Sequence, residues 1–556
     1  MSNKKFFIAV FGLLAIRIFF SRLTGVWFPT NQHFDDELMI SYANFYQHFI
    51  NHSEIFNETL IKNIGFPVFL NLSGEIGLVY TDALSLLWFF AALLSVVLFY
   101  KVTEITKKSV WLMIYAFVLF TPAAFDSWCG TRLYRNAVLA PLYFIVLNMT
   151  AIIFVKHFDS VKINLLKFFP YQVALGLFLT LTFYVKEDGV WILAVLIFVL
   201  IVCLIKNLLQ KNFSIPYKFF HLCILILPLI IFWCGTNFYK DINYKYFGVR
   251  EINTRTEGEV GKFVKSVYKI KSDERTGKIW APADAVQKAF DASETLKNNP
   301  KLRDAVFYSP WFRNNIFENQ IHGDFLGWVL LTAVRDSGTC TTLAEQENYF
   351  KKVNAELDAA FANGTLEKDS KIQLVSSMGG RSFIEILKLS KLVIQAYGIH
   401  ISLYEYIPGS IPAQRLPPQN EQEELWTNTA INLTHINLLE QNENSELMNA
   451  LISILFIIYG VGQTVLFIFG FIGTCWGIFK IVKKEISFSD KLTLAVLIAT
   501  GIFLLAIIYA VAISWFCEFI SPSELRHFAL KFYSIGLIPM FMSFEIFGMY
   551  LFYRKG

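Results

Sequence analysis

The chain is poor in charged residues. Of its 556 residues, 17% are Asp, Glu, Lys or Arg and 55% are hydrophobic, which gives a mean hydropathy of +0.46. Soluble domains average about 25% charged residues. The low charge excludes an ordinary soluble protein. Apolar runs of roughly twenty residues recur along the chain and predict an all-α polytopic membrane protein.

The sequence also lacks the common motifs for nucleotides, metals and an activated serine. It contains no Walker loop, no glycine fingerprint after a strand, no HExxH pair and no Gly-x-Ser-x-Gly elbow. The net charge is only +5, and the basic residues lie mostly in short loops. This distribution is typical of membrane orientation and does not indicate nucleic-acid binding.

Cysteine is scarce, with seven residues, most of them in or beside apolar runs. We expect Cys129 and Cys340 outside the membrane, but their spacing matches no disulfide framework. The sequence leaves open whether these two residues pair or remain free thiols.

Ten apolar runs are interpreted as membrane spans. They cover residues 6–20, 77–100, 110–124, 137–155, 168–185, 190–205, 219–238, 451–479, 492–516 and 532–553. This topology places every Lys-rich short loop on one side, which the positive-inside rule assigns to the cytoplasm together with both termini. We expect a multi-pass protein of the plasma (inner) membrane. The eighth run is long for one helix, so it is expected to tilt or overhang.

The spans divide the chain into three parts. Residues 1–238 form an N-terminal transmembrane module of about seven spans, with an acidic first exterior loop at 23–64. Residues 239–448 form an extracytoplasmic, mostly helical domain. Residues 449–556 form a C-terminal module of about three spans.

Helix signals outside the spans are local. Apolar spacing predicts an amphipathic surface helix over residues 36–50. Thr342 and Glu345 predict a capping box for a helix that ends at Asn363. A further helix is expected over residues 382–397, stopping at Gly398.

An acidic triplet, Asp35, Asp36 and Glu37, begins the expected surface helix. Adjacent carboxylates repel one another, so one of them can have a raised pKa and serve as a general base, or both can bind a cation. The alternative is a solvated acidic patch at a helix N-terminus, where the helix dipole favours acids.

Two further clusters lie at the same exterior side. Lys186, Glu187 and Asp188 occupy a tight turn between two spans, where polar groups either form a simple turn or line a cavity. Arg132 and Arg135 stand on the side that the positive-inside rule disfavours. Their planar guanidinium groups suit a lipid phosphate, and pairing with Asp126 or with headgroups is the alternative.

A fourth cluster precedes the last span. Arg526 and His527 lie in an expected exterior turn at residues 521–531 and form a second basic patch on the disfavoured side. A phosphate or acceptor contact and an interfacial anchor are both compatible with this pattern.

With these clusters the chain resembles the GT-C superfamily of integral-membrane glycosyltransferases, which includes oligosaccharyltransferases, protein O-mannosyltransferases and lipid A aminoarabinose transferases. It is similar to uncharacterised bacterial members over nearly its whole length. The segments that carry the resemblance are residues 35–39, 132–136, 186–189, 243–248, 325–328 and 335–336.

The resemblance implies a GT-C-like fold, a polyprenyl-phosphate or polyprenyl-diphosphate sugar donor, and an extracytoplasmic glycan, lipid or protein acceptor. It implies that Asp35 or Asp36 is the general base, with a slight preference for Asp35, in an inverting displacement. Phosphate or substrate would be bound by Arg132, Arg135, Lys186, Arg526 and His527, and by Glu187 and Asp188, which could hold acceptor hydroxyls. Members of the superfamily differ in needing a divalent cation, Mg²⁺ or Mn²⁺, for which the candidate ligands are Asp36, Glu187 and Asp188.

Three other readings stay open. A lipid-linked polysaccharide polymerase or ligase would also use exterior basic residues. A transporter would need ionisable positions near the middle of the bilayer, and the spans are nearly free of charge. A non-catalytic assembly subunit would tolerate Asn at Asp35 and Asp36.

Overall fold

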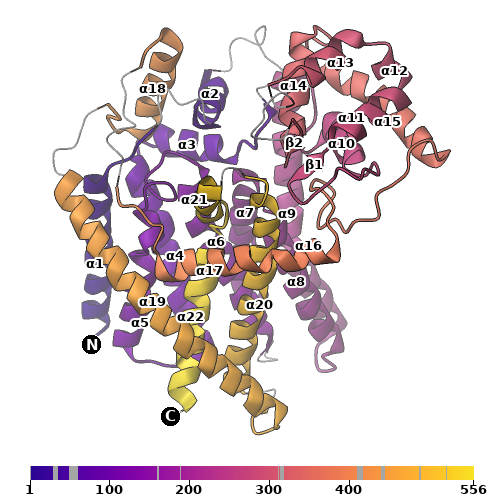
Figure 1. Ribbon diagram of the computed structural model, residues 1–556. Helices are drawn as coiled ribbons and strands as arrows, with labels where there is room; N and C mark the ends of the chain where they lie inside the picture. The colour runs from indigo at the N-terminus through magenta and orange to yellow at the C-terminus, as the bar shows by residue number, and fades with distance from the viewer. Residues whose placement is uncertain are drawn as a thin grey trace.

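The computed structural model describes residues 2–28, 35–48, 60–158, 162–187, 189–310, 312, 319–409, 418–439, 445–487, 490–520 and 523–555. Within these ranges the chain is a bundle of long helices with a helical polar region beside it (Figure 1). The two-stranded pairing of β1 (Ile279–Ala281) with β2 (Ile321–His322) is antiparallel. Apart from this short pair, the regular elements of the described residues are helices, which confirms the expected all-α polytopic architecture.

Eight of the described helices are long and apolar enough to cross a membrane. They are α1 (Asn3–Thr24), α4 (Tyr80–Thr103), α6 (Arg135–Phe158), α7 (Leu165–Val185), α8 (Val190–Leu209), α9 (Ile215–Phe247), α19 (Ser445–Val482) and α20 (Lys491–Cys517).

The two remaining expected spans are also helical, but they differ from simple crossings. The third expected span is the short helix α5 (Lys108–Leu119), which leads into the 3-10 helix η2 (Pro122–Ala124). The tenth is α22 (Leu537–Lys555), which is bent by 65° relative to the preceding helix α21 (Ser523–Tyr533). The count of ten spans is not confirmed, because only this bent pair could raise the eight to nine.

Both termini lie at one end of the bundle, whereas α2 (Asp35–His48) and α3 (Gly65–Glu75) lie at the other end (Figure 1). We call the second end the α2 face. Helix α19 is continuous over 38 residues and crosses the bundle obliquely, as its length predicted (Figure 1).

Most helices of the polar region lie at and beside the α2 face (Figure 1). They are α10 (Gly258–Val267), α11 (Ala283–Ala292), α12 (Glu294–Lys297), α13 (Pro300–Phe307), α14 (Leu326–Asp336), α15 (Leu343–Ala362) and α18 (Glu421–Thr434). In contrast, α16 (Phe383–Lys388) and α17 (Ser390–Ser402) run across the middle of the bundle (Figure 1).

Local helix predictions had mixed outcomes. The Thr342 hydroxyl accepts from the Glu345 amide at 3.2 Å and starts α15 as predicted. The stop predicted at Gly398 is wrong, since α17 continues to Ser402 and ends where Leu403 takes the left-handed conformation, with φ 59°. The exterior turn expected before the last span is also wrong, because that segment forms α21. Cys129 and Cys340 are both buried free thiols.

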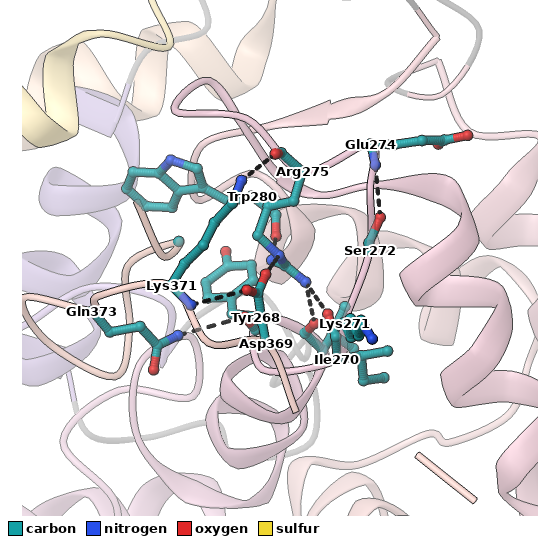
Figure 2. Close-up of polar contacts among 12 residues, drawn as sticks. Tyr268, Ile270, Lys271, Ser272, Glu274, Arg275, Trp280, Asp369, Lys371 and Gln373 are labelled. Carbon is teal, nitrogen blue, oxygen red and sulfur yellow. Dashed lines mark hydrogen bonds and ion pairs between the residues drawn. The ribbon is translucent and has the colours of Figure 1, made fainter. Parts of the chain in front are cut away.

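A buried arginine organises the centre of the polar region. Arg275 forms an ion pair with Asp369, with Nε 3.0 Å from Oδ2. Its Nη2 donates to the carbonyl oxygens of Val267 at 3.0 Å and Ile270 at 2.6 Å, and Nη1 donates to the carbonyl of Trp280 (Figure 2). The Arg275 guanidinium therefore connects the end of α10 to β1 and to the segment after α15.

A raised carboxyl pKa predicts a pH effect in the same region. Burial, assisted by the carboxylates of Glu251 and Glu259, raises the pKa of Glu347 from 4.5 to about 7. The folded state therefore binds more protons than the unfolded state between these values, and stability falls as the pH rises through that window. We expect Glu347→Gln to stabilise the protein by about 1–2 kcal/mol above pH 7, discounted for solvent screening.

Thermal unfolding of the two proteins at pH values on both sides of this window measures the effect. The gain should vanish in acid, where Glu347 is protonated like its amide replacement. An equal gain at every pH would assign the change to packing and contradict the titration.

Candidate functional site

The acidic triplet is fixed at the α2 face by one buried ion pair. The Asp36 side chain is fully buried, and Arg132 Nε lies 2.7 Å from its Oδ1, while Nη2 of the same guanidinium donates to Oδ2. Both carboxylate oxygens are thus engaged by a permanent cation. The Asp35 side chain lies outside the described residues.

Aromatic rings enclose the Arg132 guanidinium. Its Cζ lies between 4.9 and 5.6 Å from the ring centres of Trp27, Trp128, Tyr134 and Phe532. These rings come from the end of α1, the loop before α6, and α21. The pair therefore joins α2 to three separate parts of the bundle. Arg132 is thus ion-paired, but its partner is Asp36, whereas Asp126, the partner expected in the alternative, binds Lys531.

A second ion pair stands beside the first. Arg135 Nη1 lies 2.8 Å from Glu187 Oε2, and its Nη2 donates to the Tyr134 hydroxyl at 2.7 Å. The same Tyr134 ring lies against Arg132, so the two pairs are neighbours. The sequence clusters around residues 36, 132, 135 and 187 therefore meet in space.

Glu187 is held in its ionised form. Burial opposes ionisation, but the positive charges of Arg135, Lys62 and Arg255 outweigh it and bring the pKa of Glu187 well below its usual range. The Asn63 amide also donates to Glu187 Oε1 at 3.4 Å. This carboxylate is therefore suited to binding cations or hydroxyl groups and unsuited to storing a proton.

The sequence did not single out Lys62 and Arg255. Lys62 lies 5.1 Å from the ring centre of Trp328, and Arg255 forms an ion pair with Asp324. Their segments are joined by Asn253, whose side chain donates to Asn63 Oδ1 at 2.8 Å across 190 residues of sequence. The only signal was the resemblance at residues 325–328, which bears on Trp328 and not on the two cations.

The other predicted residues lie around α21. Lys186 is buried, with Nζ 5.0 Å from the Tyr533 ring centre. Arg526 Nε donates to the Ile520 carbonyl at 3.2 Å, and both cations lie within electrostatic range of Cys517. His527 Nδ1 is 3.9 Å from a Glu405 carboxylate oxygen. Lys186 and Arg526 thus each lie near Cys517, the last residue of α20.

The predicted cation site is not assembled within the described part of the chain. There, no three His, Cys, Asp or Glu side chains converge on one point. Asp188 lies outside the described residues, while Asp36 and Glu187 each bind an arginine. A Mg²⁺ or Mn²⁺ site at these residues stays a prediction.

Close packing at Gly65 holds the segment with Lys62 and Asn63 against this site. A Cβ at Gly65 would lie 2.3 Å from the carbonyl carbon of Tyr184 and 2.5 Å from the Val185 amide nitrogen. Both are backbone atoms and cannot swing away. We expect Gly65→Ala to destabilise the protein by about 3 kcal/mol, measured by thermal unfolding.

Gly12→Ala is the matched control, because nothing lies within 4 Å of a Cβ there. It replaces a helical glycine and should not destabilise the protein. Equal stability of the two variants would contradict the close approach of α3 to α7.

The comparisons with known proteins add no relative. The chain matches no protein-family model, and searches of curated proteins and of solved structures also return no match. The function is therefore argued from the site itself.

Proposed function

We propose that this protein is a membrane glycosyltransferase that moves a sugar from a polyprenyl-phosphate-linked donor to an extracytoplasmic acceptor. The observation that carries the proposal is the cluster at the α2 face, where the acidic start of α2 is anchored beside Arg135, Glu187, Lys62 and Arg255. Acids and cations in contact at the mouth of a membrane bundle suit a reaction that moves a proton and releases a phosphate.

The roles divide among the residues as follows. Asp35 takes the proton from the acceptor hydroxyl as that oxygen attacks the anomeric carbon. Asp36 positions α2, because both of its carboxylate oxygens bind Arg132. Arg135, Lys62 and Arg255 stabilise the charge that develops on the departing lipid phosphate. Glu187 keeps these cations in place and orients acceptor hydroxyls. One direct displacement inverts the anomeric centre.

The charge distribution supports an extracytoplasmic site. The Lys-rich loop between α19 and α20 lies toward the end of the bundle that holds both termini (Figure 1). By the positive-inside rule this end faces the cytoplasm, which leaves the α2 face outside. A lipid-borne donor is then required, because nucleotide sugars are cytoplasmic.

Sugar transfer by isolated membranes tests the proposal. A panel of labelled polyprenyl-phosphate and polyprenyl-diphosphate sugars is offered to the wild type, Asp35→Asn and Asp36→Asn at matched amounts of folded protein. We expect Asp35→Asn to lose about 10²-fold or more of the transfer rate while it remains folded. Asp36→Asn should mainly lose folded protein.

Asp241→Asn is the control, since this exposed acid pairs only with exposed groups in the structure. It should transfer at the wild-type rate. Full activity in both Asp35→Asn and Asp36→Asn would remove the catalytic assignment and favour an assembly subunit.

A further inference from the structure

An acid is buried deep among the C-terminal helices. Glu545 lies in the middle of α22 and is 1% exposed. Neither carboxyl oxygen has a hydrogen-bond partner of regular geometry among the described residues, so no described cation reaches them. Its polar neighbour is Gln463 of α19, whose Oε1 also has no described partner.

The energetics of burial decide what this acid binds. An ionised carboxylate without a partner is very costly in an apolar interior, and such acids in membrane helices usually mark proton or ion paths. The described residues supply the two oxygens of Glu545 and the side chain of Gln463 at this point, which is far fewer oxygens than the six or so that a divalent cation takes. A proton needs only one carboxyl oxygen, and the Gln463 amide group can donate to the other.

A small cavity lies beyond Gln463, one helical turn along α22 from the acid, and Glu545 itself does not line it. Its volume is about 10 Å³, close to the room that one water molecule needs. Gln463, Phe541 and Ile538 line it. Phe541 and Ile538 precede Glu545 by four and seven residues, so all three share one face of α22.

The far wall of the cavity is formed by α17 and the segment that follows it. His400 lines this wall, with Nδ1 2.9 Å from the Tyr406 hydroxyl and Nε2 2.7 Å from Ser534 Oγ. Burial and the charge of Lys531 lower the pKa of His400 to about 3, so this wall is polar and uncharged. The cavity therefore lies between Gln463 on one side and the polar side chains of His400 and Tyr406 on the other.

We propose that Glu545 is a proton-binding site within the membrane, which exchanges its proton by way of the Gln463 side chain with water in the adjoining cavity. The proton joins a carboxylate oxygen to give the neutral acid and leaves by the same path. This site is independent of the sugar chemistry assigned above. It gives the C-terminal helices a proton-linked function.

Carbodiimide labelling of the full chain in native membranes tests the proposal. Dicyclohexylcarbodiimide enters the bilayer and reacts only with a protonated carboxyl group, and mass spectrometry of the α22 peptide measures the adduct. We expect Glu545 to be labelled, with the labelling rate falling about tenfold per pH unit above the midpoint. Glu545→Gln should lose the adduct, and Glu545→Asp should keep a titrating adduct.

Three results would overturn the proposal. An unlabelled Glu545 would mean that no protonated carboxyl is present. Labelling that does not change with pH would mean a permanently neutral acid that exchanges no proton. Suppression of labelling by sodium or magnesium ions at constant pH would make the ligand a metal cation. Glu187, which is ion-paired, should stay unlabelled throughout.

Discussion

Replacing Arg132 with leucine is expected to destabilise the protein by about 3–5 kcal/mol, because it leaves the fully buried Asp36 carboxylate without its cation. The change also removes the centre of an aromatic enclosure that joins α2 to the end of α1 and to α21. Thermal unfolding of the purified protein in detergent measures the loss. Proteolysis of α2 should increase in parallel.

The matched control is an exposed pair of the same chemistry. Arg250 Nε lies 2.8 Å from Asp241 Oδ1, but both side chains are more than half exposed. Arg250→Leu should cost about 0–1 kcal/mol. If Arg132→Leu unfolds like this control yet loses sugar transfer, Arg132 acts on substrate and its pairing with Asp36 is not structural.

The fold could be predicted from the sequence wherever the length of an apolar run determines that the run forms a helix. Eight of the ten expected spans coincide with single long helices, because roughly twenty apolar residues can satisfy their backbone in lipid only as a helix. The errors lie where apolar length gives no information. The break between α21 and α22 and the passage of α17 through Gly398 depend on tertiary packing and on the conformation of Leu403.

Fewer residues of the candidate site could be predicted from the sequence. The clusters at residues 36, 132, 135 and 187 were found because charges at the ends of spans are unusual. Lys62 and Arg255 were missed because each looks like an ordinary loop cation until the fold brings both near Glu187. Glu545 was missed because one acid hardly changes the hydropathy of a long apolar run, and its isolation appears only once α19 and α22 are packed.

Replacing Lys531 with methionine is the second change for which we expect a loss of about 3–5 kcal/mol. Lys531 Nζ lies 2.9 Å from Asp126 Oδ1, and the side chains of both residues are at most 1% exposed. The same carboxylate accepts from the amides of Trp128, Cys129 and Ile407, at 3.1, 2.9 and 2.9 Å. These amides fix Asp126 in place, so it cannot move to water when the ammonium is removed.

Lys531→Met should loosen the segment after α17 in addition to lowering the stability of the whole protein. Lys531 Nζ also donates to the Glu405 carbonyl at 2.7 Å, so its loss frees the segment after α17 from α21. Limited proteolysis should cut near residues 403–409 before the rest of the chain, and thermal unfolding should shift downward. Lys288→Met is the control, because Lys288 forms a half-exposed pair with Asp284 worth about 0–1 kcal/mol.

The double variant Asp126→Asn with Lys531→Met separates charge from packing. The Asn oxygen can still accept from the Trp128 and Cys129 amides, although its NH₂ group then faces the Ile407 amide. No buried charge remains unpaired, so the double variant should recover part of the stability lost in Lys531→Met. Recovery would make α21 a helix held to the loop before α6 by a structural ion pair. A double variant no more stable than Lys531→Met would instead assign the loss to the ammonium's contact with the Glu405 carbonyl and the Tyr406 ring.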